Sequence, residues 1–453
     1  MRKKPSGTED ALPAKAVTRR SVVIAAGAAL GLSASGAWAQ TTEAAWWQTL
    51  FDPPGSSRRR VAAPQESAPD VLADLRPDAT PWRSEAILNA MDGAIARYHQ
   101  IVARGGWRTL PAGRLMRPGE DDVRVPYVRH RLVLAGDLRS RGPSYDGSYT
   151  FDAALAEGVM RFQQRHGLRT TGRVDQPTLA QMNVSADARL EQLKLNQRRI
   201  RELMEGRIED RYVLVNVAAF QLEAVEGHAV QRRHRVIVGK PERPTPSVKA
   251  TVRGLNFFPS WRVPDSVASL DLIPRLQKEP EYLREQRIHV LGPSGAELDS
   301  SSIDWHQVEA TKVKFRQDPG PHNALGLVRI DMPNEHMVYM HDTPMKPLFR
   351  ERARAFSAGC VRVEDVFALA EWVARYETGW EQPGRAQDVI AAGQSLDVAL
   401  THPVPVYFTY ITAWAERDGR VEFRPDLYGR DGSRDYVGEL DPDAPPPPAM
   451  LAP

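Results

Sequence analysis

The chain of 453 residues contains one cysteine, Cys360, and the residues around it are typical of a reactive thiol. The small residues Ser357-Ala358-Gly359 allow the backbone to turn sharply and to expose N–H groups just before the sulfur. A helix is expected to begin near Glu364, and a helix N-terminus with a nearby arginine lowers the pKa of a thiol. The pattern therefore predicts that Cys360 is a nucleophile that reacts as its thiolate.

A histidine that could serve as its base, His341, lies 19 residues upstream in the segment Tyr339-Met340-His341-Asp342. Histidine is the usual base for a nucleophilic cysteine. If this segment is a strand, Tyr339 and His341 face one side and Asp342 faces the other, so a backbone carbonyl is expected to orient the imidazole. A papain-like protease is disfavoured because its cysteine precedes its histidine. A zinc peptidase is disfavoured because the chain has no His-Glu-x-x-His motif.

The sequence of this region as a whole resembles that of the L,D-transpeptidases that have a YkuD-type catalytic domain. Their pattern of Tyr-x-His-Asp-Thr-Pro, a basic loop and Ser-x-Gly-Cys-Val-Arg stands at residues 339–362. The stretches at 261–264 and 319–326 match as well, and the resemblance covers roughly residues 80–430. The order of parts is similar to the larger periplasmic YcbB-type branch. In that branch a helical scaffold and a peptidoglycan-binding module precede a catalytic domain with an inserted capping subdomain.

The resemblance assigns the chemistry residue by residue. Cys360 would attack the carbonyl of the third residue of a donor tetrapeptide, and His341 would act as general base and then as general acid. The backbone N–H groups of Cys360 and Gly359 would face the oxyanion, and the N–H of Ala358 is a further candidate. The commonest family wording has histidine where this chain has Ala358. The family's base is the upstream histidine, so this departure leaves the base in place. No metal ion and no cofactor is implied.

Four further residues are candidates for substrate contacts, and each has a structural alternative. Tyr339 could face the pocket or pack in the core, and Trp261 could line the acceptor groove or serve as a core aromatic residue. Arg362 could bind a substrate carboxylate or hold the turn of the motif. Ser357 is expected to hydrogen-bond the motif loop rather than to react.

A second motif lies ahead of the catalytic one, at residues 145–183. Its Phe162-Gln163 pair, a Gly167 turn that would end a helix in the left-handed conformation, and a closing Thr178-Leu179 resemble the type 1 peptidoglycan-binding domain. The alternative is a helical bundle that binds nothing.

Periodicity places these motifs in an α+β multidomain chain. Apolar residues recur every three or four positions from about 82 to 204, which is typical of helices, and alternate from 211 onward, which is typical of strands. A helical pattern interrupts the strands after residue 265. Together with the resemblance, this organisation predicts a linker at 40–80, a helical scaffold at 81–116 and 184–210, a peptidoglycan-binding module at 117–183, a catalytic domain at 211–430 with a helical cap inserted at about 265–310, and a disordered proline-rich tail at 431–453.

The first 39 residues are typical of a signal peptide. Arg19 and Arg20 precede an apolar stretch, and Ala37-Trp38-Ala39 supplies a cleavage site, as in twin-arginine export to the periplasm. An uncleaved membrane anchor is the alternative. This segment holds six Lys/Arg and two Asp/Glu, and the remainder is close to neutral with 54 basic and 55 acidic residues. The near-neutral net charge of the chain after residue 39 gives no support to nucleic-acid binding.

The predicted activity is the formation of 3→3 cross-links between peptidoglycan stem peptides, with a tetrapeptide donor and a diaminopimelate acceptor. Other cell-wall synthases are candidate partners, and carbapenems are expected to acylate Cys360. Three alternatives stay open: an L,D-carboxypeptidase, an enzyme that attaches or detaches a wall lipoprotein, and a non-catalytic wall-binding scaffold. The sequence does not separate the first two from transpeptidation, because all of them use Cys360.

Overall fold

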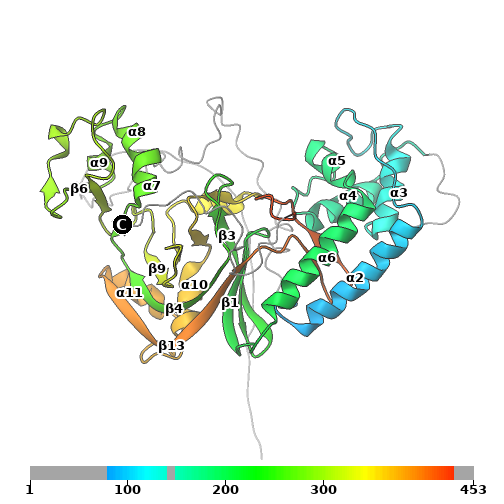
Figure 1. Ribbon diagram of the computed structural model, residues 1–453. Coiled ribbons are helices and arrows are strands. Elements are labelled where there is room, and N and C mark those ends of the chain that lie inside the picture. Colours follow the sequence, from blue (N-terminus) through cyan, green and yellow to red (C-terminus); the bar gives the residue numbers. More distant parts are fainter. Residues whose placement is uncertain (1–78, 140–147, 433–453) are drawn as a thin grey trace, which may run out of the picture. The chain divides into compact units, whose positions relative to one another are not determined.

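The structure is a computed structural model that describes residues 79–139 and 148–432 (Figure 1). The predicted signal peptide and nearly all of the predicted linker lie outside these ranges. Ala79 and Thr80, which close the predicted linker, are already buried. None of the helices within the described ranges is both long enough and apolar enough to span a membrane.

Two long helices form the scaffold and lie side by side (Figure 1). α2 (Glu85–Ala103) begins after Ser84, and α6 (Ala186–Leu203) begins after Ser185. Each serine hydroxyl accepts an N–H of the first turn, which would otherwise have no partner. The apolar faces of both helices belong to one hydrophobic core. The helical first half predicted from the sequence is confirmed.

The module between these two helices has a hydrophobic core of its own. Its helices are α3 (Val125–Ala135), α4 (Ala153–Arg165) and α5 (Gln176–Met182). The core residues extend from Leu110 to Met182. Gln163 of the Phe-Gln pair is fully buried, and its amide donates to Thr178 Oγ1 at 3.0 Å and accepts the Gly172 N–H at 2.9 Å. The motif residues therefore fix the turns of the module.

The second half of the chain is built on a nine-stranded sheet with the order β11-β3-β12-β10-β9-β4-β13-β1-β2. Its strands are β1 (Arg211–Asn216), β2 (Gln221–Glu226), β3 (Ala229–Gly239), β4 (Val248–Phe257), β9 (Val328–Asp331), β10 (Met340–His341), β11 (Ala355–Ser357), β12 (Val361–Val363) and β13 (Leu396–Thr409). A further pairing of β2 with β3 closes the strands from β3 to β2 into a ring, and β11 pairs with β3 outside it. Helices α10 (Val366–Ala374) and α11 (Arg385–Ala392) contribute to the same core. The strand-rich second half is confirmed.

An insertion of mixed structure separates β4 from β9. Its helical elements are α7 (Asp265–Val267), the π-helix η2 (Ala268–Leu272), α8 (Ile273–Leu276), α9 (Tyr282–Glu285) and the short 3-10 turn η3 (Ser300–Ser302). Its strands β5 (Trp261–Arg262), β6 (Ile288–Leu291), β7 (Glu297–Leu298) and β8 (Lys314–Gln317) form a second sheet. The prediction of a purely helical cap is therefore wrong for its second half. Strands of two to four residues are too short to show a period of two.

The chain returns to the scaffold at its C-terminal end. Strand β13 ends at Thr409, and a separate hairpin of β14 (Ala413–Ala415) and β15 (Val421–Phe423) packs against α2 and α6. Trp414 of this hairpin meets Trp82 edge to face, with ring centroids 5.7 Å apart. The apolar residues from Ile411 to Phe423 thus share the scaffold core, whereas Tyr410 belongs to the core of the nine-stranded sheet.

The predicted start of the disordered tail at residue 431 is too early. Asp431 accepts hydrogen bonds from Arg199 of α6 at 2.8 Å and from Thr412 at 2.9 Å. The proline-rich composition that predicted the tail begins only after this residue, and the residues from 433 onward lie outside the described ranges.

Candidate active site

The sheet brings the two parts of the catalytic motif onto neighbouring strands. β10 runs parallel to β12, and His341 is the register partner of Arg362. Tyr339 and Cys360, two positions earlier on each chain segment, are also neighbours, because their side chains are hydrogen-bonded. Register partners and residues two apart share one face of a sheet. These four side chains therefore gather on one face.

The thiol of Cys360 is half-buried and ends a short chain of hydrogen bonds. The Tyr339 hydroxyl donates to the sulfur, and the Trp261 indole donates to the Tyr339 hydroxyl. Trp261 is buried at the first strand of the insertion, so the insertion reaches the site. Both aromatic residues singled out in the sequence lie at the thiol.

Burial raises the pKa of the Cys360 thiol above its ordinary value. Hydrogen bonds from Tyr339 and the positive charges of Arg362 and Arg329 only partly offset this effect. The predicted lowering of this pKa is therefore wrong. Strand β12 lies between Cys360 and α10, which begins at Val366, and a helix terminus acts mainly over about one turn.

His341 is buried, and a main-chain carbonyl orients its imidazole as predicted. Nδ1 lies 2.5 Å from the Asp342 carbonyl oxygen, which can only accept, so Nδ1 carries the proton and Nε2 keeps the lone pair. The Asp342 carboxylate is used elsewhere, accepting the Leu327 N–H at 2.9 Å and pairing with Lys346. Burial, followed by the Arg362 charge, lowers the pKa of His341 to about 3. The imidazole is therefore neutral at physiological pH.

Ser357 holds the turn that presents the sulfur. Its hydroxyl donates to the Cys360 carbonyl at 2.5 Å and accepts the Gly359 N–H at 3.1 Å. With its N–H used in this way, Gly359 does not fit the predicted role of oxyanion donor. Within the ranges that the structure describes, the N–H groups of Ala358 and Cys360 have no hydrogen-bond partner, and Ala358 is exposed. These two groups are the free donors of the loop.

Arg362 is buried beneath the site. Its guanidinium contacts Met345 Sδ at 3.7 Å, and burial lowers its pKa to about 10. Its charge favours the thiolate of Cys360 and disfavours the imidazolium of His341. Neither of the two roles predicted for Arg362 included this electrostatic effect on both groups.

Two residues at the site were not found from the sequence. Arg329 on β9 is the register partner of His341, and its guanidinium lies 5.5 Å from the centroid of the Tyr339 ring. Thr245 donates its hydroxyl proton to the Gly359 carbonyl at 2.8 Å. The alternation at 328–331 could have placed Arg329 on this face, whereas no local pattern connects Thr245 with the motif. In the described part of the chain, no group of three or more His, Cys, Asp and Glu side chains could hold a metal ion.

The directions of these pKa shifts predict how thiol alkylation depends on pH. Neutral His341 cannot stabilise a thiolate by charge, and the pKa of Cys360 is raised. The rate of reaction with iodoacetamide should therefore rise without a plateau at neutral pH and keep rising beyond about pH 8.5, the ordinary thiol value. Mass spectrometry reports a single site, because Cys360 is the one cysteine of the chain, and Cys360→Ala gives the background. A plateau at neutral pH would instead indicate a preformed thiolate–imidazolium pair.

Comparisons with known proteins identify two domains in this chain. The family model of the YkuD L,D-transpeptidase catalytic domain matches residues 210–406, and that of a putative peptidoglycan binding domain matches residues 130–182. A curated protein of Haemophilus influenzae, a putative L,D-transpeptidase, is 31% identical over 256 residues, which make up 56% of this chain and 50% of that protein. The match thus spans about half the length of the curated relative.

Solved structures of L,D-transpeptidases are more distant. The catalytic domain of the Enterococcus faecium L,D-transpeptidase acylated by ertapenem is 13% identical, with a TM-score of 0.21 and coverage of 45% of this chain and 100% of that one. The L,D-transpeptidase from Mycobacterium smegmatis is also 13% identical, with a TM-score of 0.21 and coverage of 44% and 58%. The two family models and the curated relative show a YkuD L,D-transpeptidase catalytic domain at residues 210–406, preceded by a putative peptidoglycan binding domain at residues 130–182.

Proposed function

We propose that this protein is a peptidoglycan L,D-transpeptidase that forms 3→3 cross-links through a thioester on Cys360. The observation that supports it most is the gathering of three groups beside two parallel strands. These are the Cys360 sulfur, the neutral imidazole of His341 and the unpartnered N–H of Cys360. A nucleophile, a base and an oxyanion donor are the parts that acyl transfer needs.

In the first half-reaction, the Cys360 sulfur attacks the carbonyl carbon of the third residue of a donor tetrapeptide. His341 Nε2 takes the thiol proton during the attack, because the raised thiol pKa and the lowered imidazole pKa disfavour transfer beforehand. The C–N bond to the terminal D-alanine then breaks, and the leaving nitrogen takes the proton from His341. The product is a thioester on Cys360.

The protein groups around the sulfur would stabilise the charges that develop in this step. The N–H of Cys360, with that of Ala358 as a second candidate, would donate to the oxyanion. Removing one such donor costs about 2.7–4 kcal/mol of transition-state stabilisation. The Tyr339 hydroxyl and the Arg362 charge would stabilise the sulfur as it gains or regains negative charge, since both favour the thiolate.

In the second half-reaction, the side-chain amine of an acceptor stem attacks the thioester, and His341 moves a proton from this amine to the departing sulfur. Water in place of the amine would give a carboxypeptidase. The insertion is the candidate shield against water. It reaches the thiol through Trp261, and its Asp271 pairs with Arg243, with one N–O distance of 3.0 Å.

The substrate implies a place outside the cytoplasm. We assign export to the twin-arginine route on the strength of Arg19 and Arg20, and the periplasm as the working compartment. The module at 130–182 would hold the enzyme on the wall, where stem peptides are concentrated.

The test is mass spectrometry of the products formed from purified disaccharide-tetrapeptides, with the wild-type protein beside Cys360→Ala. Wild type is expected to give 3→3 dimers and free D-alanine, and Cys360→Ala is expected to give neither. A carbapenem should add its mass to the wild type alone, because its strained ring presents a carbonyl to the sulfur.

Other outcomes would support a different function for Cys360 or for the protein. Tripeptide without dimer would indicate a carboxypeptidase that uses the same cysteine. A folded protein with a reduced thiol that gives no product and no adduct would contradict the catalytic proposal and leave a wall-binding scaffold.

A further inference from the structure

We propose that Thr245 is a positioning residue for the oxyanion donor, and that Tyr428 from the C-terminal segment holds Thr245 in place. The inference rests on the proposed function, because it concerns the N–H that would stabilise the oxyanion when Cys360 is acylated.

Thr245 is fully buried and lies directly against the motif loop. Its hydroxyl donates to the Gly359 carbonyl at 2.8 Å and accepts the Gly239 N–H at 2.8 Å. Gly239 ends β3 and is the register partner of Ser357 on β11. A single hydroxyl therefore ties the motif loop to the sheet, with its proton and a lone pair both used in fixed directions.

The Gly359 carbonyl belongs to the same peptide unit as the Cys360 N–H. Such a unit is planar, and in its trans form the C=O and the N–H point in opposite directions. A donor that fixes the carbonyl on one side therefore fixes the direction of the N–H on the other. The same hydrogen bond polarises the unit and strengthens the N–H as a donor.

Glycine at position 359 makes this support necessary. Its φ of 121° lies in a region that glycine enters freely, and without a side chain its peptide units rotate more easily than those of other residues. The Ser357 hydroxyl holds the N–H side of Gly359 at 3.1 Å, and Thr245 holds the carbonyl side. Loss of the Thr245 hydroxyl would release only the side that carries the Cys360 N–H.

Tyr428 supports Thr245 from the far end of the chain. Its hydroxyl donates to the Gly239 carbonyl at 2.5 Å and accepts the Thr245 N–H at 3.3 Å. The loop from Gly239 to Thr245 folds tightly, since a Cβ on Gly239 would lie 2.2 Å from the Arg243 carbonyl oxygen. The Tyr428 hydroxyl thus closes the base of the loop that presents Thr245.

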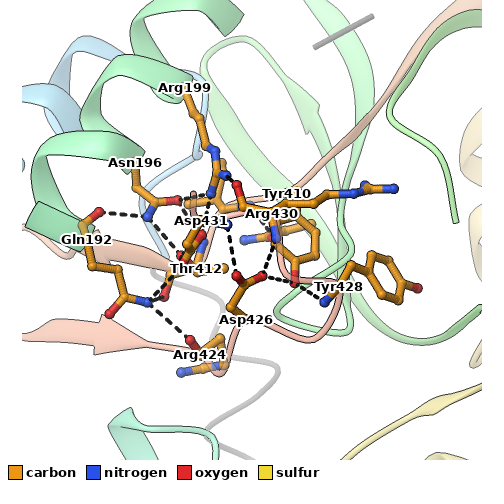
Figure 2. Close-up of polar contacts among 12 residues, drawn as sticks. Gln192, Asn196, Arg199, Tyr410, Thr412, Arg424, Asp426, Tyr428, Arg430 and Asp431 are labelled. Carbon is orange, nitrogen blue, oxygen red and sulfur yellow. Dashed lines mark hydrogen bonds and ion pairs between the residues drawn. The ribbon is translucent and has the colours of Figure 1, made fainter. Parts of the chain in front are cut away.

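The segment that carries Tyr428 is itself anchored, as Figure 2 shows. Tyr410 stacks on Tyr428 with ring centroids 5.5 Å apart, accepts its N–H at 2.8 Å and donates to Asp426 at 2.8 Å. Asp431 pairs with Arg199 of α6 at 2.8 Å. A continuous set of contacts therefore runs from the scaffold helix to the peptide unit of Cys360.

The test compares a reaction that needs the oxyanion donor with one that does not. Acylation of Cys360 by a carbapenem passes through an oxyanion, whereas alkylation by iodoacetamide does not. Thr245→Val is expected to slow acylation about 10–100-fold, less than the full removal of a donor, and to leave alkylation unchanged. Thr245→Ser keeps the hydroxyl and should restore most of the acylation rate. Tyr428→Phe should slow acylation less than Thr245→Val does, again without an effect on alkylation.

Tyr407→Phe is the matched control. It also removes a buried tyrosine hydroxyl, one that donates to Glu209 and has no contact with the loop, so both rates should equal those of the wild type. Circular dichroism and thermal unfolding establish that each variant is folded. If Thr245→Val does not fold, the ratio of the acylation rate to the alkylation rate in Tyr428→Phe tests the inference. A ratio below that of the wild type supports it, and an unchanged ratio overturns it.

The outcomes separate this inference from the proposed function. Suppose that the wild-type protein is acylated. If Thr245→Val then lost acylation and alkylation rates equally, or if Thr245→Ser did not restore the acylation rate, the inference alone would be overturned. An unchanged acylation rate in Thr245→Val would do the same. A wild-type protein that is alkylated at Cys360 but never acylated would overturn the proposed function and the inference together.

Discussion

His341→Gln is expected to slow the acylation of Cys360 by about 10²–10⁴-fold, the usual contribution of a general base. Glutamine keeps a donor for the Asp342 carbonyl but has no nitrogen that can take the thiol proton. The imidazole is neutral, with its pKa lowered to about 3, so the change removes no buried charge and the fold should persist. The measurement is the first-order rate at which a carbapenem increases the mass of the protein.

Two comparisons make this result specific to proton transfer. The rate at which iodoacetamide alkylates Cys360 at about pH 10, where hydroxide ion removes the thiol proton, should be the same in His341→Gln and the wild type. His336→Gln changes a partly exposed histidine on the loop before β10 and should leave both reactions unchanged. If His341→Gln were acylated as fast as the wild type, another group would have to be the base.

The site could be predicted from the sequence only in part. Cys360 and His341 stand in local wording that specifies a loop and a strand, and the strands bring them to one face. The direction of the thiol pKa shift could not be predicted, because it depends on burial by residues distant in the sequence. Thr245 could not be predicted either, since its partners Gly359 and Tyr428 lie 114 and 183 positions away.

The fold shows the same division between local and distant information. Helices such as α2 have a capping serine and a regular apolar face, so both their existence and their starts could be predicted. β1 also reads as a strand, but it is buried on both faces, with Val213 and Val215 in the sheet core and Tyr212 and Leu214 in the scaffold core. No local sequence pattern predicts that the hairpin of β14 and β15 packs against α2 and α6. That arrangement follows from which apolar faces remain to be buried.

The junction of scaffold and sheet contains a fully buried carboxylate. Glu223 on β2 accepts the Trp82 N–H at 2.8 Å, and its other oxygen lies 3.4 Å from the guanidinium of Arg233 on β3. Burial raises the pKa of Glu223 to about 7, although the positive charge of Arg233 acts in the opposite direction. Breaking a buried pair by removing one partner leaves an uncompensated charge, so the loss of Arg233 should be costly.

Arg233→Met is therefore expected to lower the free energy of unfolding by about 1.4 kcal/mol more at about pH 8 than at about pH 5, because Glu223 is mostly charged at pH 8 in the wild type and must take up a proton in the variant. An acid whose pKa is raised on folding loses stability as the pH rises from its unfolded value, near 4.5, through its folded value. At about pH 5 the folded protein keeps Glu223 protonated with or without Arg233, so only the lost packing of Arg233 contributes to the deficit there. Urea unfolding followed by tryptophan fluorescence measures both values, and Arg232→Met, exposed on the same strand, should stay within about 0.5 kcal/mol of the wild type. Equal deficits at the two pH values would mean that Arg233 stabilises the junction through its position 4.8 Å from the Trp82 ring centroid rather than through its charge on Glu223.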